Sequence, residues 1–169
     1  MTVAKPLVVA VSGVKNSGKT TLIEAMLPLL EESGLTVAVV KHDGHSFDAD
    51  PPGTDTGRFM AAGAAGTAIF DGEKFKIVKK QPVTEDFLIT QFPEADLILL
   101  EGFKHTGWPK LEVVRKGNSE EPVSDPATLL ALVTDLPLEV PDVPVLPLDQ
   151  PHEAVRFLLR LVKEDGGHA

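Results

Sequence analysis

The stretch that decides the fold lies near the amino-terminal end and reads Val8-Val9-Ala10-Val11-Ser12-Gly13-Val14-Lys15-Asn16-Ser17-Gly18-Lys19-Thr20-Thr21-Leu22. It opens with an apolar, β-branched run, continues with the pattern Gly-x-x-x-x-Gly-Lys-Thr, and ends in apolar residues at helical spacing. Strand, glycine-rich loop and helix in this order are the context that a phosphate-binding loop (P-loop) requires. A plain glycine-rich turn before a helix is the alternative, but it requires neither the Lys-Thr pair nor both flanking elements.

Each part of this loop has a physical reason to bind phosphate. Gly13 and Gly18 permit backbone angles and a close approach that a Cβ would block. The N–H groups from Val14 to Thr20 can point inward as a nest for an anion, and the following helix adds the positive end of its dipole. Lys19 supplies a mobile charge for the β- and γ-phosphates, and Thr20 supplies a hydroxyl for Mg²⁺.

Length and composition exclude several classes of protein. The chain has 169 residues, 43% of them apolar, which suits one domain (1–169) with a sizeable core. Its net charge of −9 argues against a nucleic-acid partner, and the absence of cysteine excludes disulfides and thiolate metal sites. The segment before the first strand is too short to lead a signal peptide, and no apolar run approaches a membrane span. We therefore expect a cytoplasmic protein with no membrane partner.

A second informative stretch is Ala95-Asp96-Leu97-Ile98-Leu99-Leu100-Glu101-Gly102. Consecutive aliphatic residues followed by an acid predict a buried strand with a carboxylate at its end, which is the Walker B arrangement. Glu101 would then lie beside the phosphate-binding loop, where it can hold Mg²⁺ through water or position an attacking water. A simply solvated acid at the end of an apolar strand is the alternative interpretation.

The segment between Lys41 and Arg58 is dense in polar and turn residues. It follows a Val-rich strand predicted over residues 36–41, which we expect to be central in a parallel sheet. Because the carboxyl edge of such a sheet carries the ligand site, Asp43 is a candidate Mg²⁺ ligand. Lys41 and Arg58 are candidate phosphate contacts, and the whole segment is a candidate switch loop. An ordinary solvated loop is the alternative.

The remaining pattern alternates helices and strands. It predicts an α/β protein with the three-layer P-loop NTPase fold, in which helices flank a mostly parallel sheet. Asp71-Gly72 predicts a β-hairpin extension, which is either a dimer contact or a solvated edge. We expect a frayed tail at residues 164–169. Helices are predicted over residues 19–33, 58–65, 84–91 and 151–163, and further strands over 7–11, 67–71, 75–78, 111–114, 129–133 and 145–146.

Two more loops at the same edge carry candidate ligand contacts. Lys104, His105 and Lys110 can bind an anionic second ligand. Asp135 directly follows an apolar strand, and a carboxylate there can accept hydrogen bonds from N1 and N2 of guanine, which adenine cannot satisfy. A helix cap or a turn would use the same Thr-Asp pair, so this position alone leaves both interpretations open.

Three stretches can now be taken together: Gly13-Val14-Lys15-Asn16-Ser17-Gly18-Lys19-Thr20-Thr21-Leu22; then Val40-Lys41-His42-Asp43-Gly44-His45 with Asp55-Thr56-Gly57-Arg58 and Ala62-Gly63-Ala64; then Leu99-Leu100-Glu101-Gly102-Phe103-Lys104 with Pro109-Lys110-Leu111-Glu112-Val113. Together they closely resemble the molybdopterin-guanine dinucleotide biosynthesis adapter (MobB) family. The likeness extends in order from about Pro6 to the C-terminal helix. The second and third stretches are much more specific to this family than the first.

This resemblance implies a homodimeric, GTP-binding P-loop protein that is at most a weak GTPase. Its role would be to assist the guanylyltransferase MobA, which attaches GMP to molybdopterin in molybdenum cofactor biosynthesis. Carried over by motif, Thr20 and Glu101, with Asp43 as a further candidate, would serve Mg²⁺. Lys19 and Glu101 would be the catalytic residues, and Asp135 would contact guanine. The residues that bind the phosphates would be Gly13, Val14, Lys15, Asn16, Ser17, Gly18, Lys19, Thr20 and Thr21.

Two other functions would use the same loop. A small-molecule kinase would hold its acceptor between His42 and Arg58 and would need a basic lid, for which the cluster Lys74–Lys80 is the candidate. A metal-insertion GTPase would instead use His42, His45 and His105. Substrate-dependent ADP formation would identify the kinase, and stoichiometric binding of nickel or zinc would identify the metal-insertion protein.

Overall fold

The computed structural model describes residues 5–44 and 47–166, and the chain divides into two compact units. The sheet unit comprises Met1–His42 and Glu85–Ala169, and the hairpin unit comprises Asp43–Thr84. The sequence predicts a loop, a helix and a hairpin of one domain for the residues of the hairpin unit.

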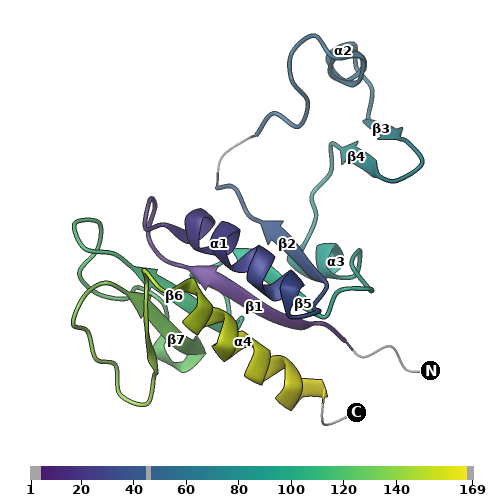
Figure 1. Cartoon of the computed structure of the whole chain (residues 1–169). Coiled ribbons are helices and arrows are strands. Elements are labelled where there is room, and N and C mark those ends of the chain that lie inside the picture. The colour runs from purple at the N-terminus through teal and green to yellow at the C-terminus, as the bar shows by residue number, and fades with distance from the viewer. Residues whose placement is uncertain (1–4, 45–46, 167–169) are drawn as a thin grey trace. The chain divides into compact units, whose positions relative to one another are not determined.

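A parallel sheet forms the centre of the sheet unit (Figure 1). The elements of this unit are β1 (Leu7–Ser12), α1 (Lys19–Glu32), β2 (Val37–Lys41), α3 (Glu85–Ile89), β5 (Leu97–Glu101), β6 (Lys110–Val114), the 3₁₀ turn η1 (Pro126–Thr128), β7 (Leu129–Thr134), β8 (Val145–Pro147) and α4 (Pro151–Gly166). Within the described residues the sheet has six strands in the order β2-β5-β1-β6-β7-β8, each parallel to its neighbours. β1 lies between β5 and β6, so the loop that follows it opens at the carboxyl edge, where ligands bind in such sheets.

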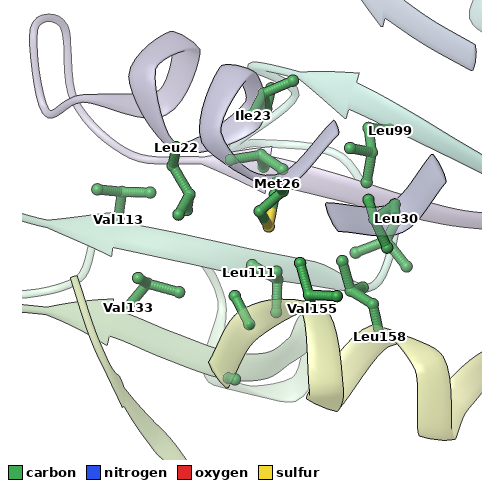
Figure 2. Packing of buried hydrophobic residues seen from close by; sticks show 14 of the residues in the cluster. Leu22, Ile23, Met26, Leu30, Leu99, Leu111, Val113, Val133, Val155 and Leu158 are labelled. Atoms are coloured by element: carbon green, nitrogen blue, oxygen red, sulfur yellow. The ribbon is translucent and has the colours of Figure 1, made fainter. Parts of the chain in front are cut away.

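The larger core lies between one face of the sheet and the helices α1 and α4 (Figure 2). Alternate residues of β1 point to this face, so Val9 and Val11 are buried beneath the helices whereas Ala10 belongs to the opposite face. In α1 the buried residues recur at the three- and four-residue spacing of an amphipathic helix. The buried helix residues are Leu22, Ile23, Met26 and Leu30 in α1 and Ala154, Val155 and Leu158 in α4.

A smaller core covers the opposite face of the sheet. Buried residues of β1, β2 and β5 form it, and Leu88 and Ile89 of α3 pack against them. Trp108 and Phe103, from the loop after β5, are partly buried in the same cluster. Helices therefore lie on both faces of the sheet, which confirms the predicted three-layer α/β fold.

The helix and the two strands of the hairpin unit contain no buried residue. Its ladder places Phe70 opposite Phe75 and Ala68 opposite Ile77 on one face, and the two phenylalanines are 83% and 75% exposed. This antiparallel pair confirms the predicted hairpin. The elements of the unit are α2 (Asp55–Ala61), β3 (Gly66–Phe70) and β4 (Phe75–Lys79).

Polar contacts hold Lys74 and Lys76 of the hairpin unit. Lys76 Nζ donates a hydrogen bond to Asp50 Oδ1 at 2.8 Å and another to the carbonyl oxygen of Ala49, so the segment before α2 is attached to β4. The hydrogen bond from Lys76 lowers the pKa of Asp50. Lys74 forms an ion pair with Asp71 across the turn, with 3.1 Å between Nζ and Oδ2. Members of the Lys74–Lys80 cluster thus have partners within this unit.

One strand does not lie where its composition predicts. The Val-rich run at residues 36–41 is expected to be central, but β2 lies at the edge of the sheet and, among the described strands, pairs with β5 alone. Val39 is accordingly 36% exposed. That prediction is wrong because strand order depends on how the crossovers return to the sheet, which a local apolar run does not encode.

Helix boundaries also differ from the prediction, most clearly in α2 and α4. α2 begins at Asp55 rather than at residue 58, because Thr54 caps it by accepting the N–H of Gly57 on Oγ1 at 3.3 Å. α4 continues to Gly166, so residues 164–166 of the predicted frayed tail are helical, and residues 167–169 lie outside the described part of the chain. In the ranges 5–44 and 47–166, no helix has both the length and the apolar content to cross a bilayer.

Candidate nucleotide-binding site

The loop between β1 and α1 has the backbone of an anion-binding nest. Gly13, Asn16 and Gly18 have positive φ angles of 133°, 63° and 100°. Such angles, repeated within one loop, turn successive N–H groups toward a common centre. The Oγ atom of Ser17 is buried and has no hydrogen-bond partner in the described part of the chain. The loop therefore presents backbone donors, whereas the Ser17 hydroxyl is buried beside Gly13.

Gly13 is required for a second reason besides its φ angle. A Cβ at this position would lie 2.5 Å from the carbonyl oxygen of Val113 on β6 and 2.8 Å from Ser17 Oγ. A Cβ on Gly18, by contrast, would meet nothing within 4 Å, so only the backbone angle demands glycine there. The beginning of the loop is thus seated directly against β6.

The side chain of Lys19 lies over its own loop. Its ammonium donates to the carbonyl oxygen of Val14 at 2.7 Å and to that of Gly13 at 3.2 Å. Both acceptors are neutral carbonyls, so a phosphate oxygen would be a stronger partner for the same ammonium.

Charged groups of both signs surround Lys19. Burial lowers the pKa of Lys19; the carboxylate of Glu101 opposes this shift, and the ammonium groups of Lys104 and Lys41 add to it. An anion bound between these cations would stabilise the charged form of Lys19. The electrostatics therefore favour a phosphate at this position.

The two nucleotide-binding motifs meet at Glu101, the last residue of β5. Thr20 Oγ1 donates to Glu101 Oε1 at 2.7 Å, and Lys41 Nζ lies 3.2 Å from the same oxygen. The parallel register places Glu101 beside both Lys41 of β2 and Val11 of β1. The structure thus brings together Thr20, Glu101 and Lys41, while their roles toward Mg²⁺ and phosphate stay predictions. A hydroxyl and a carboxylate are ligands that Mg²⁺ accepts, so this pair fits the metal.

A turn after β6 links Asp135 to the phosphate-binding loop. Asp135 Oδ1 accepts the N–H of Lys116 at 2.7 Å, and Asn118 Nδ2 donates to the carbonyl oxygen of Lys15 at 3.0 Å. Asp135 therefore has the turn-stabilising role that the sequence leaves open. This bond engages one oxygen, and a carboxylate has acceptor sites on two. Sequence reasoning missed Asn118, although a polar turn at the same sheet edge as Asp135 was the signal for it.

Two predicted site residues belong to the hairpin unit. Asp43 is its first residue, and Arg58 lies in α2, where its guanidinium is 3.5 Å from Asp55 Oδ1. Their proposed contacts with Mg²⁺ and phosphate stay predictions.

Two of the three histidines of the metal-site alternative, His42 and His105, are described by the structure, and they have different surroundings. The ring of His42 packs against the ring of Phe103 with 5.5 Å between centroids. His105 lines a separate pocket after β5, and His45 lies outside the described residues. Across the residues that the structure describes, no group of three or more His, Asp or Glu side chains is arranged to hold a metal.

β6 carries two buried charged residues whose positions the sequence does not reveal. Glu112 is 1% exposed, and its two carboxylate oxygens accept the N–H groups of Val123 at 2.7 Å and Ser124 at 3.0 Å. Lys110, which the sequence analysis offers as a direct ligand contact, is fully buried, and its ammonium donates to the carbonyl oxygen of Thr106 at 2.7 Å. Charged residues inside a strand next to β1 were the available signal.

These observations define the class of the protein. A parallel sheet, a glycine-rich loop after its central strand, and a Thr-to-Glu hydrogen bond between that loop and the neighbouring strand are the features of a P-loop nucleotide-binding protein.

Comparisons with known proteins place the chain more narrowly. The family model described as "Molybdopterin guanine dinucleotide synthesis protein B" (MobB) matches residues 8–135. Molybdopterin-guanine dinucleotide biosynthesis adapter proteins from Haemophilus influenzae and Escherichia coli K12 are 34% and 31% identical to the chain. The alignments cover 77% and 89% of this chain and 75% and 90% of those relatives. The chain belongs to the MobB family, as its sequence motifs indicate.

Solved structures agree with this assignment. The crystal structure of Bacillus subtilis MobB matches with a TM-score of 0.75 and 32% identity, over 90% of this chain and 96% of that one. A MobB homologue from Bacillus stearothermophilus matches with a TM-score of 0.66 and 25% identity, over 93% and 98% of the two chains. The likeness therefore covers nearly the whole chain, including residues of both units.

Proposed function

We propose that this protein is a GTP-binding adapter, at most a weak GTPase, that acts in molybdenum cofactor biosynthesis. Relatives that match most of the chain are named molybdopterin-guanine dinucleotide biosynthesis adapter proteins. The adapter would assist the guanylyltransferase MobA in transferring a guanylyl group to molybdopterin. The hydrogen bond between Thr20 and Glu101 carries the proposal, because it joins the phosphate-binding loop to the acidic strand in one site.

The chemistry of this site fits GTP with Mg²⁺. The N–H groups that the positive φ angles of Gly13, Asn16 and Gly18 turn toward a common centre suit phosphate oxygens. Thr20 and Glu101 would hold Mg²⁺, which would neutralise part of the phosphate charge when bound. Asp43 is a third proposed metal contact, and Lys41 and Arg58 are proposed phosphate contacts.

The proposed catalytic residues are Lys19 and Glu101. Lys19 would leave its carbonyl partners for the phosphate oxygens and stabilise the negative charge that develops during phosphoryl transfer. Glu101, held by its contacts to Thr20 and Lys41, would position a water molecule in line with the γ-phosphate. An adapter needs bound nucleotide rather than turnover, so we expect slow hydrolysis.

We further propose that the protein is a cytoplasmic homodimer and that the hairpin contributes to the dimer contact. The exposed face that holds Phe70 and Phe75 supports this assignment. A two-stranded hairpin is marginally stable when isolated, and exposed apolar patches mark association surfaces. A second copy of the chain would cover this face.

Calorimetric titration with non-hydrolysable GTP and ATP, each with Mg²⁺, tests the proposed function. GTP should bind at least about 100-fold more tightly than ATP, because a site built for hydrogen bonds rejects a base that leaves them unpaired. Lys19→Ala should abolish binding of both nucleotides. Asp135→Asn should shift the preference to the xanthosine analogue, whose O2 accepts from an amide. Lys163→Ala, which removes a charge from an exposed position on α4, is the control. ATP binding equal to GTP binding would overturn the assignment.

A further inference from the structure

The connection between β6 and β7, residues 115–128, contacts β1 and the phosphate-binding loop at two points. Near the beginning of the connection, Asn118 Nδ2 donates to the carbonyl oxygen of Lys15 at 3.0 Å. Near its end, Ser124 Oγ lies 3.1 Å from Oγ of Ser12, the last residue of β1, and both serines are buried. The start of the phosphate-binding loop is therefore held from the side by a segment that is distant in the sequence.

A buried carboxylate on β6 fixes the second of these points. Glu112 accepts the N–H groups of Val123 and Ser124 on its two oxygens, at 2.7 Å and 3.0 Å. The parallel register between β1 and β6 places Glu112 opposite Ser12. Burying a charged side chain is costly unless it is hydrogen-bonded, and here the two hydrogen bonds hold Ser124 against the end of β1. The end of the connection is thus anchored to the sheet.

The beginning of the connection forms a turn that also holds Asp135. The N–H groups of Asn118 and Ser119 both donate to the carbonyl oxygen of Arg115 at 3.0 Å, which closes the turn over residues 115–119. In the same turn, the N–H of Lys116 donates to Asp135 Oδ1 at 2.7 Å. One short turn therefore contacts the phosphate-binding loop through a side chain and Asp135 through its backbone.

Asn118 is the side chain that joins this turn to the phosphate-binding loop. Its amide nitrogen is a donor, which suits the carbonyl oxygen of Lys15. The residue is exposed and belongs to neither hydrophobic core. Loss of its hydrogen bond should therefore change the position of the turn against the loop without disturbing the core.

We propose that Asn118 is a positioning residue for nucleotide binding, which keeps the phosphate-binding loop and Asp135 in the arrangement that one nucleotide requires. The proposal rests on the proposed function, because it takes the loop to bind the phosphates of GTP and Asp135 to contact guanine. Asn118 contacts neither part of the nucleotide and acts through Lys15 and Asp135. Groups that are held in place before the ligand arrives lose less freedom on binding, so both parts of GTP are bound more tightly.

The test compares GTP with inosine triphosphate (ITP), which lacks the 2-amino group of guanine. Calorimetric titrations use the full chain, Mg²⁺ and non-hydrolysable analogues of both nucleotides. Wild type should bind GTP at least about tenfold more tightly than ITP, because ITP leaves one acceptor site of Asp135 unpaired. Asn118→Ala should weaken GTP binding about fivefold and ITP binding only about twofold, so that the preference for GTP falls.

Two further variants separate positioning from a general effect on the protein. Ser119→Ala changes the next residue of the turn, whose hydroxyl has no hydrogen-bond partner in the described part of the chain, and should leave both affinities unchanged. In an Asp135→Ala background, Asn118→Ala should no longer alter the ratio of GTP to ITP affinity. Unchanged affinities in Asn118→Ala, or an equal fall for GTP and ITP, would overturn the proposal.

Hydrogen exchange of the Lys116 amide in the nucleotide-free protein supplies a measurement that needs no ligand. Asn118→Ala should speed this exchange about threefold or more, because the turn loses its attachment to the loop, whereas Ser119→Ala should not. If wild type binds neither nucleotide, or binds GTP and ITP equally, the proposed function or its guanine contact fails by itself. The exchange rate then decides whether Asn118 positions Asp135, and an unchanged rate in Asn118→Ala contradicts that role.

Discussion

The sheet unit and the hairpin unit differ in how far their apolar residues are buried. Every residue of β5 and β6 is buried, and the helices α1 and α4 close the core above them. No residue of β3, β4 or α2, all of which the structure describes, is buried. Phe70 and Phe75, on one face of the hairpin, are mostly exposed. The sheet unit thus has a buried core of its own, whereas the hairpin unit leaves an apolar surface exposed.

This difference separates the two proposed activities of the protein. The nucleotide site depends on close packing between β1, its loop and β6, so it should fail when that packing is disturbed. The proposed association between copies of the chain depends on side chains that contribute little to the fold. Substitutions of these side chains should therefore abolish association without loss of the nucleotide site. Substitutions in one unit should therefore change one property and spare the other.

The largest effect is expected for Gly13→Ala. The new Cβ would meet the carbonyl oxygen of Val113 at 2.5 Å in a backbone conformation that alanine rarely adopts. We expect a loss of about 3 kcal/mol in the free energy of unfolding, measured by urea denaturation. Gly18→Ala shares the unfavourable φ angle without the clash, and should lose only about 1 kcal/mol. Equal losses for the two variants would show that the loop is not seated tightly on β6.

Phe75→Asp should break association and leave the sheet unit intact. Removing a central aromatic anchor from an interface costs about 2 kcal/mol or more, a loss of roughly 30-fold in affinity between copies. Sedimentation equilibrium measures this change, and calorimetry should find GTP affinity unaltered. Phe47→Asp is the matched control, because Phe47 is 73% exposed but lies outside β3 and β4. Unchanged association of Phe75→Asp would exclude the hairpin as the dimer contact.

Thr20→Val should distinguish the contribution of Mg²⁺ to GTP binding from the contribution of direct contacts with the nucleotide. The substitution removes the hydroxyl that donates to Glu101 while keeping a side chain of similar shape. GTP affinity in the presence of Mg²⁺ should fall about tenfold, since a metal ligand is lost, and affinity in EDTA should stay the same. Thr20→Ser keeps the hydroxyl and should restore the wild-type ratio. An equal fall with and without Mg²⁺ would mean that Thr20 contacts phosphate instead.

The sequence predicts which residues of the candidate nucleotide site lie together where they are contiguous in the chain or end an apolar strand. Gly13, Gly18, Lys19 and Thr20 form one pattern, and Glu101 is found because it ends an apolar strand. The structure brings Thr20 and Glu101 together through parallel register, which strand composition and a P-loop already imply. The core face of α1 follows in the same way from helical spacing.

The remainder depends on contacts that are distant in the sequence. The Val-rich run of β2 predicts a central strand, but β2 lies at an edge of the sheet. The prediction is wrong because such a run does not encode the order of the strands. Glu112 reads as an ordinary strand residue, since its partners are backbone N–H groups of a later loop. Asn118 reaches the carbonyl of Lys15 across a long sequence separation. Local periodicity in the sequence does not predict contacts between residues that lie so far apart along the chain.

The smallest effect expected is a change in pH dependence for Lys110→Met, which replaces a buried ammonium of the sheet unit by an apolar chain of similar length. Burial lowers the pKa of Lys110 from its usual 10.5, although Glu112 and Asp125 oppose the shift. Below its folded-state pKa, both states hold the proton and the penalty is fully present. Between that pKa and 10.5 the unfolded chain binds more protons, so wild-type stability gains from rising pH. Urea denaturation across this alkaline range should show a smaller gain for Lys110→Met. Parallel curves for the two proteins would mean that Lys110 titrates alike in the folded and unfolded states.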